Sequence, residues 1–428
     1  MSSKRKFNTT SPSSIRFQPS IVLTISPAIS PISLQNLPIE MLFCVAEQCS
    51  SERDINALGR ASRQLHNLLD PYLYRYNAHH SKSSALKWAA TKGRVSTTKK
   101  SLVATAGIHE ATSYVSAALD IAAMHGHDGV VEVLLEDEAV DVNAKSTFNR
   151  TPLACATWSG HESVVKVLLG NQAVDVNARD YTSVTPLSLA ARTGNEAIAR
   201  LLLADRRVDF NLRDLWGNTA LLDATQRFNT GIVKLLLSQE GIEVNDTGLH
   251  TPLTFASGHG HEEIVKLLLE HNEVDPNMRG SLGETPLIIA AEAGRLAVVR
   301  LLLAKDGIDV NATDDSGRAP LHAACQTGRE EIVKLLLQQK DVEVNVEEEH
   351  GMTPLYIAVA AEHVAVAKLL LRHEGVNHRC KDIDGVTLLD VAFSVGNEDM
   401  VALLLTVPSI ERESISSLGK MLLRNDKS

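Results

Sequence analysis

Cysteine and aromatic residues are scarce in this sequence. Phe, Trp and Tyr make up 4% of its 428 residues, and five cysteines are present. These cysteines are odd in number and scattered, and none forms a Cys-x-x-Cys pair, so the spacing of a disulfide framework or a zinc site is missing. We therefore expect no bound metal, no cofactor, and a reducing compartment inside the cell, namely the cytoplasm, the nucleus or both.

Long apolar runs and excess positive charge are also missing. The sequence has no apolar run of about 18 residues, the length that a membrane span requires. Its formal net charge is −10 at pH 7, which disfavours general binding to the phosphate backbone of nucleic acid. With 44% hydrophobic and 22% charged residues, the composition is typical of a soluble globular protein. We expect a monomer that binds neither membranes nor nucleic acid.

What the sequence does contain is a repeated unit, which is clearest over residues 285–311. Thr285 and Pro286 are typical of the N-cap and the first position of a helix, and Gly294 provides the left-handed residue that ends it. A second helix with a broad apolar stripe follows as far as Leu303 and leads into an extended finger. The unit is predicted to be helix, turn, helix and finger.

Copies of this unit follow one another at steps of 34 residues, with one step of 32. They begin at Ala117, Thr151, Thr185, Thr219, Thr251, Thr285, Ala319, Thr353 and Thr387. A single copy buries too little apolar surface to fold alone, so the copies must stack. The pattern resembles the ankyrin repeat family, whose Thr-Pro-Leu-His-x-Ala core is most nearly complete at Pro320, Leu321 and His322. The resemblance implies an all-α ankyrin-repeat solenoid of helix-turn-helix units with β-hairpin fingers.

The repeat also accounts for two pairs of histidines that have the spacing of metal ligands. His125 and His127 flank the glycine that ends a first helix, and His259 and His261 do the same in another copy. Repeat geometry explains these pairs without a metal, since no cysteine or carboxylate set completes a site. No catalytic constellation is found, so we expect a binding protein and not an enzyme.

Upstream of the repeats, residues 34–80 have the pattern of a small helical bundle. A helix begins near the Leu-Pro pair at 37–38, Asp54 caps a second helix, and the apolar pattern continues to Pro71. This segment resembles an F-box, which implies docking to a Skp-type adaptor of a cullin ubiquitin ligase. The residues expected to make that contact are Leu37, Pro38, Glu40, Leu42 and Leu58. The alternative is an N-terminal helical cap for the repeats.

These patterns divide the chain into five parts. They are a disordered arm over residues 1–33, the F-box-like module over 34–80, a degenerate capping repeat over 84–116 with a poor second helix near 101–106, ankyrin repeats over 117–406 with eight full copies and a truncated ninth, and a C-terminal cap or tail over 407–428. Two copies have Phe228 or Glu362 where the helix-ending glycine belongs. Since positive φ is unfavourable for these residues, we expect local irregularity over residues 228–249.

The ankyrin resemblance implies that a partner binds at the finger tips and at the exposed end of each first helix. The tip positions are Tyr114, Phe148, Tyr181 and Trp216, and the helix-end positions are Met124, Trp158, Arg192 and Gln226. The same positions in the second half are largely polar or acidic, namely Leu282, Ser316, His350 and Asp384 at tips and Glu292, Gln326 and Ala360 at helix ends. Because aromatic residues are scarce, four at consecutive tips favour a protein-binding surface on the first half. The alternative is that these rings pack along neighbouring fingers and only stiffen the stack.

Two functional hypotheses follow from these resemblances. In the first, the chain is a substrate receptor: the F-box-like module docks the ligase adaptor, and the ankyrin surface holds the protein to be ubiquitinated. In the second, the chain is an ankyrin scaffold that assembles protein partners without a ligase role. The sequence favours the first, because residues 34–80 have a pattern of their own that the repeat does not explain.

Overall fold

The computed structural model describes residues 63–138, 140–146, 148–245, 250–408 and 410. The chain divides into two compact units, residues 1–77 and residues 78–428. The expected arm over residues 1–33 lies outside the described residues, as do the F-box-like contact residues Leu37, Pro38, Glu40, Leu42 and Leu58. Within the described ranges, no helix is both long enough and apolar enough to cross a membrane.

Helix α3 (Arg63–His80) is the described part of the F-box-like segment. The helical pattern expected up to Pro71 is found in α3, which continues through this residue to His80. A proline inside a helix removes one backbone hydrogen bond and crowds the preceding turn.

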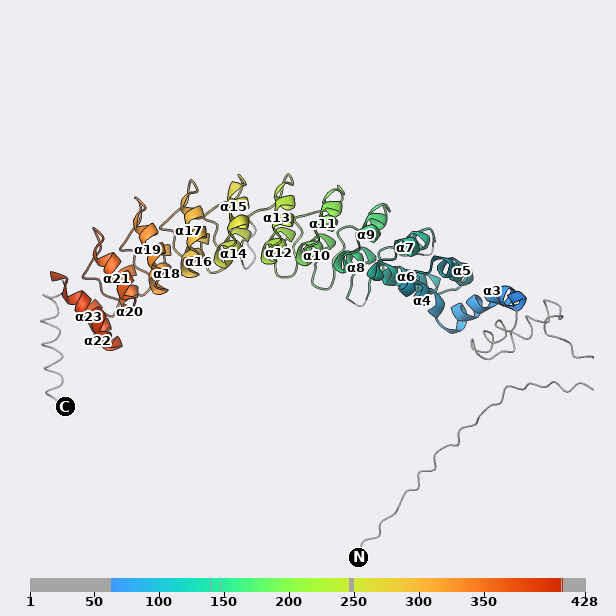
Figure 1. Ribbon diagram of the computed structural model, residues 1–428, viewed down its shortest axis with the longest axis horizontal. Coiled ribbons are helices and arrows are strands. Elements are labelled where there is room, and N and C mark those ends of the chain that lie inside the picture. Colours follow the sequence, from blue (N-terminus) through green and yellow to red (C-terminus); the bar gives the residue numbers. More distant parts are fainter. Residues whose placement is uncertain (1–62, 139, 147, 246–249, 409, 411–428) are drawn as a thin grey trace, which may run out of the picture. The chain divides into compact units, whose positions relative to one another are not determined.

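From Ser84 onward the described residues form ten helix pairs, in which the first helix has an even label and the second an odd one (Figure 1). The first helices are α4 (Ser84–Lys92), α6 (Ala111–His125), α8 (Pro152–Ser159), α10 (Pro186–Thr193), α12 (Ala220–Gln226), α14 (Pro252–His259), α16 (Pro286–Glu292), α18 (Pro320–Gln326), α20 (Pro354–Ala360) and α22 (Leu388–Val395). The second helices are α5 (Val95–Thr105), α7 (Asp128–Leu135), α9 (Glu162–Leu169), α11 (Glu196–Leu203), α13 (Thr230–Leu237), α15 (Glu262–Glu270), α17 (Leu296–Leu303), α19 (Glu330–Leu337), α21 (Val364–Leu371) and α23 (Glu398–Leu405).

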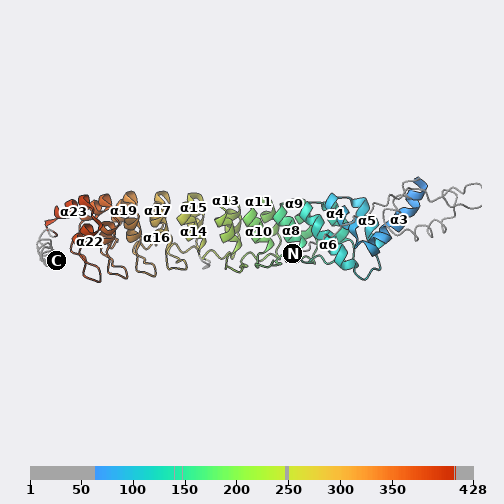
Figure 2. The same cartoon turned by 90° about the horizontal axis from the view of Figure 1, so that it is seen from below.

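These helix pairs stack side by side, so that the first helices make one row and the second helices another (Figures 1 and 2). Each first helix packs against its own second helix and against the first helices on either side. The buried side chains between the rows form one continuous apolar cluster that extends from Leu86 to Ile410. The all-helical solenoid predicted from the repeat is confirmed for this part of the chain.

The repeat at residues 285–311 has the local structure that its residue types predict. The N–H of Ile288 donates to Thr285 Oγ1 (3.3 Å), and Thr285 has the extended backbone of an N-cap. Gly294, with a φ of 72°, ends the first helix before α17 begins at Leu296. Because Thr285 supplies the cap and Gly294 the left-handed turn, two short helices can pack antiparallel within one copy.

A ladder of asparagine side chains joins successive repeats on the side of the second helices. Asn277 Nδ2 donates to the carbonyl of Gly307 in the next repeat (2.7 Å), and Asn277 Oδ1 accepts the N–H of Asp309 (2.8 Å). The same pair of bonds is made by Asn143, Asn177, Asn211, Asn245, Asn311 and Asn345. The asparagine that follows the second helix of each of these copies, in Val-Asp-Val-Asn or a variant of it, therefore satisfies backbone groups of its neighbour.

Two copies end their first helix without glycine. Phe228 and Glu362 adopt the left-handed conformation themselves, with φ of 60° and 62°. Helices α13 and α21 still follow as in the other copies, and the ladder continues through Asn245. The irregularity expected over residues 228–249 is absent from 228–245, since one strained residue is enough to make the turn; residues 246–249 lie outside the described ranges.

The two copies before Thr151 differ from the sequence-based expectation, whereas the last copy ends after its second helix as expected. Helix α5 is a complete helix from Val95, although a poor helix near residues 101–106 was expected. Helix α6 begins at Ala111 and not at Ala117, so the preceding residues extend a helix where a finger was expected. The last copy has both helices, α22 and α23. The cap expected beyond residue 410 lies outside the described residues.

Candidate partner-binding surface

Most fingers are tight turns built around a carboxylate at their base, whereas the finger over residues 145–150 has Ser146 at this position. In residues 213–218, Asp214 Oδ1 accepts the N–H groups of Trp216 (2.9 Å) and Asn218 (2.8 Å). Gly217 takes a φ of 80° in this turn. The same carboxylate cap recurs at Asp180, Asp314, Glu348 and Asp382. The tip residue is therefore held by its own backbone and points away from the stack.

The fingers contain no strand in the described part of the chain; the one bridge there is isolated and joins Lys381 to Thr387. The prediction of β-hairpin fingers is therefore wrong for the described residues, in which the fingers are turns closed by one or two backbone bonds. Neighbouring fingers are joined by single backbone bonds, such as the one from the Leu215 N–H to the Thr182 carbonyl (3.0 Å). Below, the first three fingers are residues 145–150, 179–184 and 213–218, and the last three are 313–318, 347–352 and 381–386.

Aromatic side chains are exposed on the first three fingers and on the helix beside them. Phe148, Tyr181 and Trp216 stand on the three fingers, and Trp158 lies at the end of α8; Trp158 is 50% and Trp216 54% exposed. In the described residues, none of the three finger rings stacks on another. All three finger rings are more than half exposed.

Arg150 organises the first of these aromatic side chains, and sequence reasoning missed it. Its guanidinium lies over the ring of Trp158 (4.7 Å to the centroid) and near that of Phe148 (5.9 Å). Arg150 Nε also pairs with Asp180 Oδ2 of the next finger (3.4 Å). Cation–π contact of this kind stabilises ring positions. The only sequence signal was an arginine directly before the N-cap Thr151, a position that varies among the copies.

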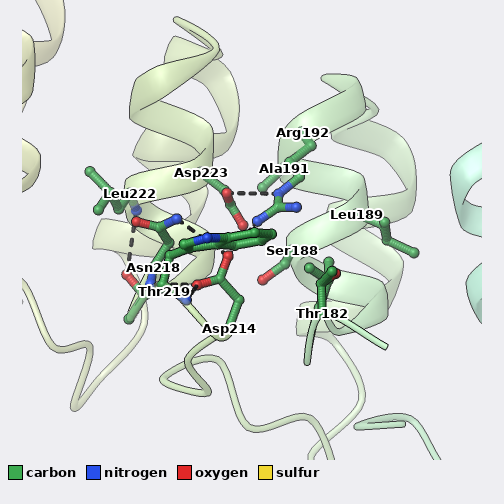
Figure 3. A network of polar contacts seen from close by, with 12 residues as sticks. Thr182, Ser188, Leu189, Ala191, Arg192, Asp214, Asn218, Thr219, Leu222 and Asp223 are labelled. Carbon is green, nitrogen blue, oxygen red and sulfur yellow. Dashed lines mark hydrogen bonds and ion pairs between the residues drawn. The ribbon is translucent and has the colours of Figure 1, made fainter. Parts of the chain in front are cut away.

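Arg192 was expected at an exposed helix end, but its charge is used inside the protein (Figure 3). Its guanidinium, at the end of α10, pairs with Asp214 Oδ2 (2.6 Å) and Asp223 Oδ1 (2.8 Å). The Asp214 side chain is 0% exposed. Burial raises the pKa of Asp223 to about 6, with Arg192 opposing the shift and Asp214 adding to it. Arg192 thus ties the third finger to helices α10 and α12 and is not an exposed partner contact.

The remaining predicted positions have mixed outcomes. Tyr114 is not on a finger: it is half-buried in the first turn of α6, and its hydroxyl donates to Glu110. Met124 is exposed at the end of α6. Gln226 is half-buried at the end of α12. The structure therefore brings Met124 and Trp158 to the helix ends beside the aromatic fingers and moves Tyr114 away from them.

The family comparison bears on this whole stack. A family model described as ankyrin repeats (3 copies) matches five overlapping stretches, residues 86–180, 121–214, 187–279, 272–348 and 340–413. The chain belongs to the ankyrin repeat family. Ankyrin repeats bind protein partners, and proteins of this family are generally binding scaffolds and not enzymes. No curated protein matches the chain in sequence.

The histidines beside the helix-ending glycines connect neighbouring ankyrin repeats. His127 Nε2 lies 3.0 Å from the Thr91 carbonyl oxygen, and His161 Nε2 lies 3.0 Å from that of Met124. Each imidazole therefore caps the end of the preceding first helix. Across the described ranges, three candidate metal ligands come together only at Glu348, Glu349 and His350.

A second aromatic group lies where the ankyrin stack departs from its glycine pattern. The Phe228 ring is 3.5 Å from that of His261, centroid to centroid, and the Phe255 ring is 4.1 Å from that of His259. Burial, followed by the nearby His259 and Arg295, lowers the pKa of His261. The contact with His261 gives Phe228 a packing role that offsets part of the cost of its left-handed backbone.

Proposed function

We propose that this ankyrin protein is an adaptor that captures a protein partner on the aromatic surface of its first repeats. The observation that supports it is the exposure of Trp158 and Trp216, each about half exposed, with the Arg150 guanidinium over the Trp158 ring. Tryptophan, tyrosine and arginine dominate binding energy at protein interfaces. Rings that are already ordered lose little conformational entropy when a partner binds.

Capture of a partner is tested by affinity purification with the full chain. We expect Trp158→Ala combined with Trp216→Ala to remove the partner, because large apolar anchors are lost while the helices remain. Phe393→Ala is the matched control, since Phe393 is 42% exposed but lies on α22, far along the sequence from these fingers. Loss of the partner with Phe393→Ala and not with the double variant would place the surface on the other half.

The finer proposal is that the chain is a substrate receptor of a cullin-type ubiquitin ligase. It rests on the F-box-like pattern of residues 34–80, whose Leu37 and Pro38 would dock a Skp-type adaptor. The rival is an ankyrin scaffold with no ligase role, in which residues 34–80 serve as a helical cap for the repeats. Either function places the chain in the cytoplasm or the nucleus, as a monomer that does no chemistry itself.

Co-purification decides between the ligase receptor and the scaffold. If residues 34–80 act as an F-box, the adaptor and the cullin co-purify with the full chain, and Leu37→Ala with Pro38→Ala removes both while the captured partner stays bound. If neither ligase component co-purifies, the scaffold function remains. The double variant thus separates ligase docking from partner capture, since the two surfaces are on different parts of the chain.

A further inference from the structure

The first three fingers are basic as well as aromatic. They carry four cations, Lys145, Arg150, Arg179 and Arg213, and two carboxylates, Asp180 and Asp214. Both carboxylates are turned inward, where Asp180 pairs with Arg150 and Asp214 with Arg192. Arg213 pairs with the exposed Glu243 (2.7 Å). The positive charge of this surface therefore comes from Lys145 and Arg179, with Arg150 shared with Asp180, although the whole chain is acidic.

Several of these cations have N–H donors that make no hydrogen bond to a described carboxylate. In the part of the chain that the structure describes, neither Lys145 nor Arg179 pairs with a carboxylate; Lys145 Nζ donates to the Arg179 carbonyl (3.3 Å). Arg150 uses Nε for Asp180, and its two terminal nitrogens make no hydrogen bond to described residues. A guanidinium with two parallel free N–H donors fits a carboxylate, and here it already lies over the Trp158 ring.

The last three fingers have the opposite charge on the same backbone. They carry seven carboxylates, Asp314, Asp315, Glu347, Glu348, Glu349, Asp382 and Asp384, against the two cations Arg318 and Lys381. Glu347, Glu349 and Asp384 are exposed. The edge formed by the fingers is thus basic and aromatic at one end and acidic at the other, so an extended polyanion would be repelled from its second half.

We propose that the first three fingers bind a protein segment in which acidic residues alternate with large apolar ones. The carboxylates of this segment pair with Lys145, Arg150 and Arg179, and its apolar side chains pack on Trp158 and the finger rings. This inference rests on the proposed capture of a protein partner and names the chemistry of that partner. A nucleic acid satisfies the cations but meets the acidic fingers further along, and a second copy of the chain is the other competing occupant.

The test uses the full chain and three labelled peptides of equal length in a fluorescence polarisation assay. The first alternates Glu or Asp with Leu or Phe, the second replaces each acid by Lys, and the third keeps the acids but replaces each apolar residue by Ser. We expect the first peptide to bind at least about tenfold tighter than either of the others. Equal or tighter binding of the lysine peptide would overturn the proposal.

Charge reversal at the fingers provides the matched variants. Lys145→Glu with Arg179→Glu should weaken binding of the first peptide about tenfold and reduce its salt dependence. Lys381→Glu, which reverses the equivalent position of the last finger, should change it less than about twofold. All three positions are exposed, so the fold is retained. An unchanged affinity in the double variant overturns the proposal.

Two further measurements identify the competing occupants. A labelled single-stranded RNA that binds more tightly than the first peptide and is lost in the same double variant would assign the fingers to nucleic acid. A dimer in sedimentation that the double variant dissociates would assign them to a second copy. If Trp158→Ala with Trp216→Ala removes the captured partner while the peptides show no preference, the capture surface stands and its acidic chemistry is refuted.

Discussion

The first three and the last three fingers have the same backbone turn but differ in the side chains that a partner would contact. Asp214 and Asp382 cap equivalent turns in the same way. One turn displays Trp216 above an Asp214 that pairs with Arg192, whereas the other displays Ile383 and the acidic Asp384. The turn geometry is therefore independent of the tip residue, which allows the tips to vary without loss of the fold.

The largest expected difference concerns the arginines that pair with the finger carboxylates. Arg192→Ala should reduce the free energy of unfolding by about 3–5 kcal/mol, because it leaves the buried Asp214 and Asp223 facing each other without a cation. Arg318→Ala removes the cation from a single buried carboxylate, Asp314, which no second carboxylate among the described residues faces in this way; like Asp214, it keeps two backbone donors. Its loss should be about 1 kcal/mol. Urea denaturation measures both; equal losses would contradict a special role for Arg192.

An intermediate effect is expected from pH at Asp223, in the first half of the stack. The pKa of Asp223 is about 6, above its ordinary value of 3.8, because the carboxyl is buried. The folded state thus favours the protonated form, so this contribution to stability is complete below about pH 4 and is lost as the pH rises through 6. Asp223→Asn should gain about 2–3 kcal/mol relative to the wild type over that interval.

Urea denaturation at several pH values between 4 and 8 checks this expectation. The difference between Asp223→Asn and the wild type should grow up to about pH 6 and then level off. Ile357 occupies the equivalent position in the second half, so no titrating group replaces Asp223 there. A difference that stays constant across this range would show that the ionisation of Asp223 is not linked to folding.

The smallest effect compares the two residues that replace a helix-ending glycine. Glu362→Gly should raise the free energy of unfolding by about 1 kcal/mol, since glycine accepts a φ of 62° without strain. Phe228→Gly relieves similar strain but loses the ring contact with His261, so its gain should be smaller or absent. Thermal unfolding of both variants provides the measurement, and a larger gain at Phe228 would mean that its ring stabilises nothing.

The sequence predicts the helix-turn-helix structure of each repeat well, because the residues that begin and end a helix interact with residues close to them in the sequence. Thr285 caps its own helix and Gly294 ends it, so both roles can be assigned from neighbours in the sequence. The roles of Arg150 and Arg192 could not be assigned in that way. Arg192 meets carboxylates that lie 22 and 31 residues further along the chain, and only the stacking distance between repeats shows that they touch.

The sequence predicted the exposed aromatic residues of the candidate surface, but it did not predict the position of Tyr114 or the local positive charge. The exposed positions of Phe148, Trp158, Tyr181 and Trp216 follow from the repeat register. Tyr114 was misplaced because the copy before Thr151 begins with a longer helix, and no residue near Ala117 signals this extension. The positive charge of the first fingers was also missed, since the composition of the whole chain is acidic and conceals a local excess of cations.

The asparagine ladder has a mechanical consequence. Every rung joins one repeat to the next, as Asn277 joins the carbonyl of Gly307, and the rungs from Asn143 to Asn345 all reach toward the C-terminal neighbour. A pulling force applied at the two ends of the stack would act on these asparagine hydrogen bonds in series. The weakest contact between two repeats would break first and divide the stack into two shorter stacks. The copy that begins at Thr219 is two residues shorter than its neighbours but keeps the hydrogen bond from Asn245 to the next repeat. This deletion in a finger therefore leaves the series of asparagine contacts continuous.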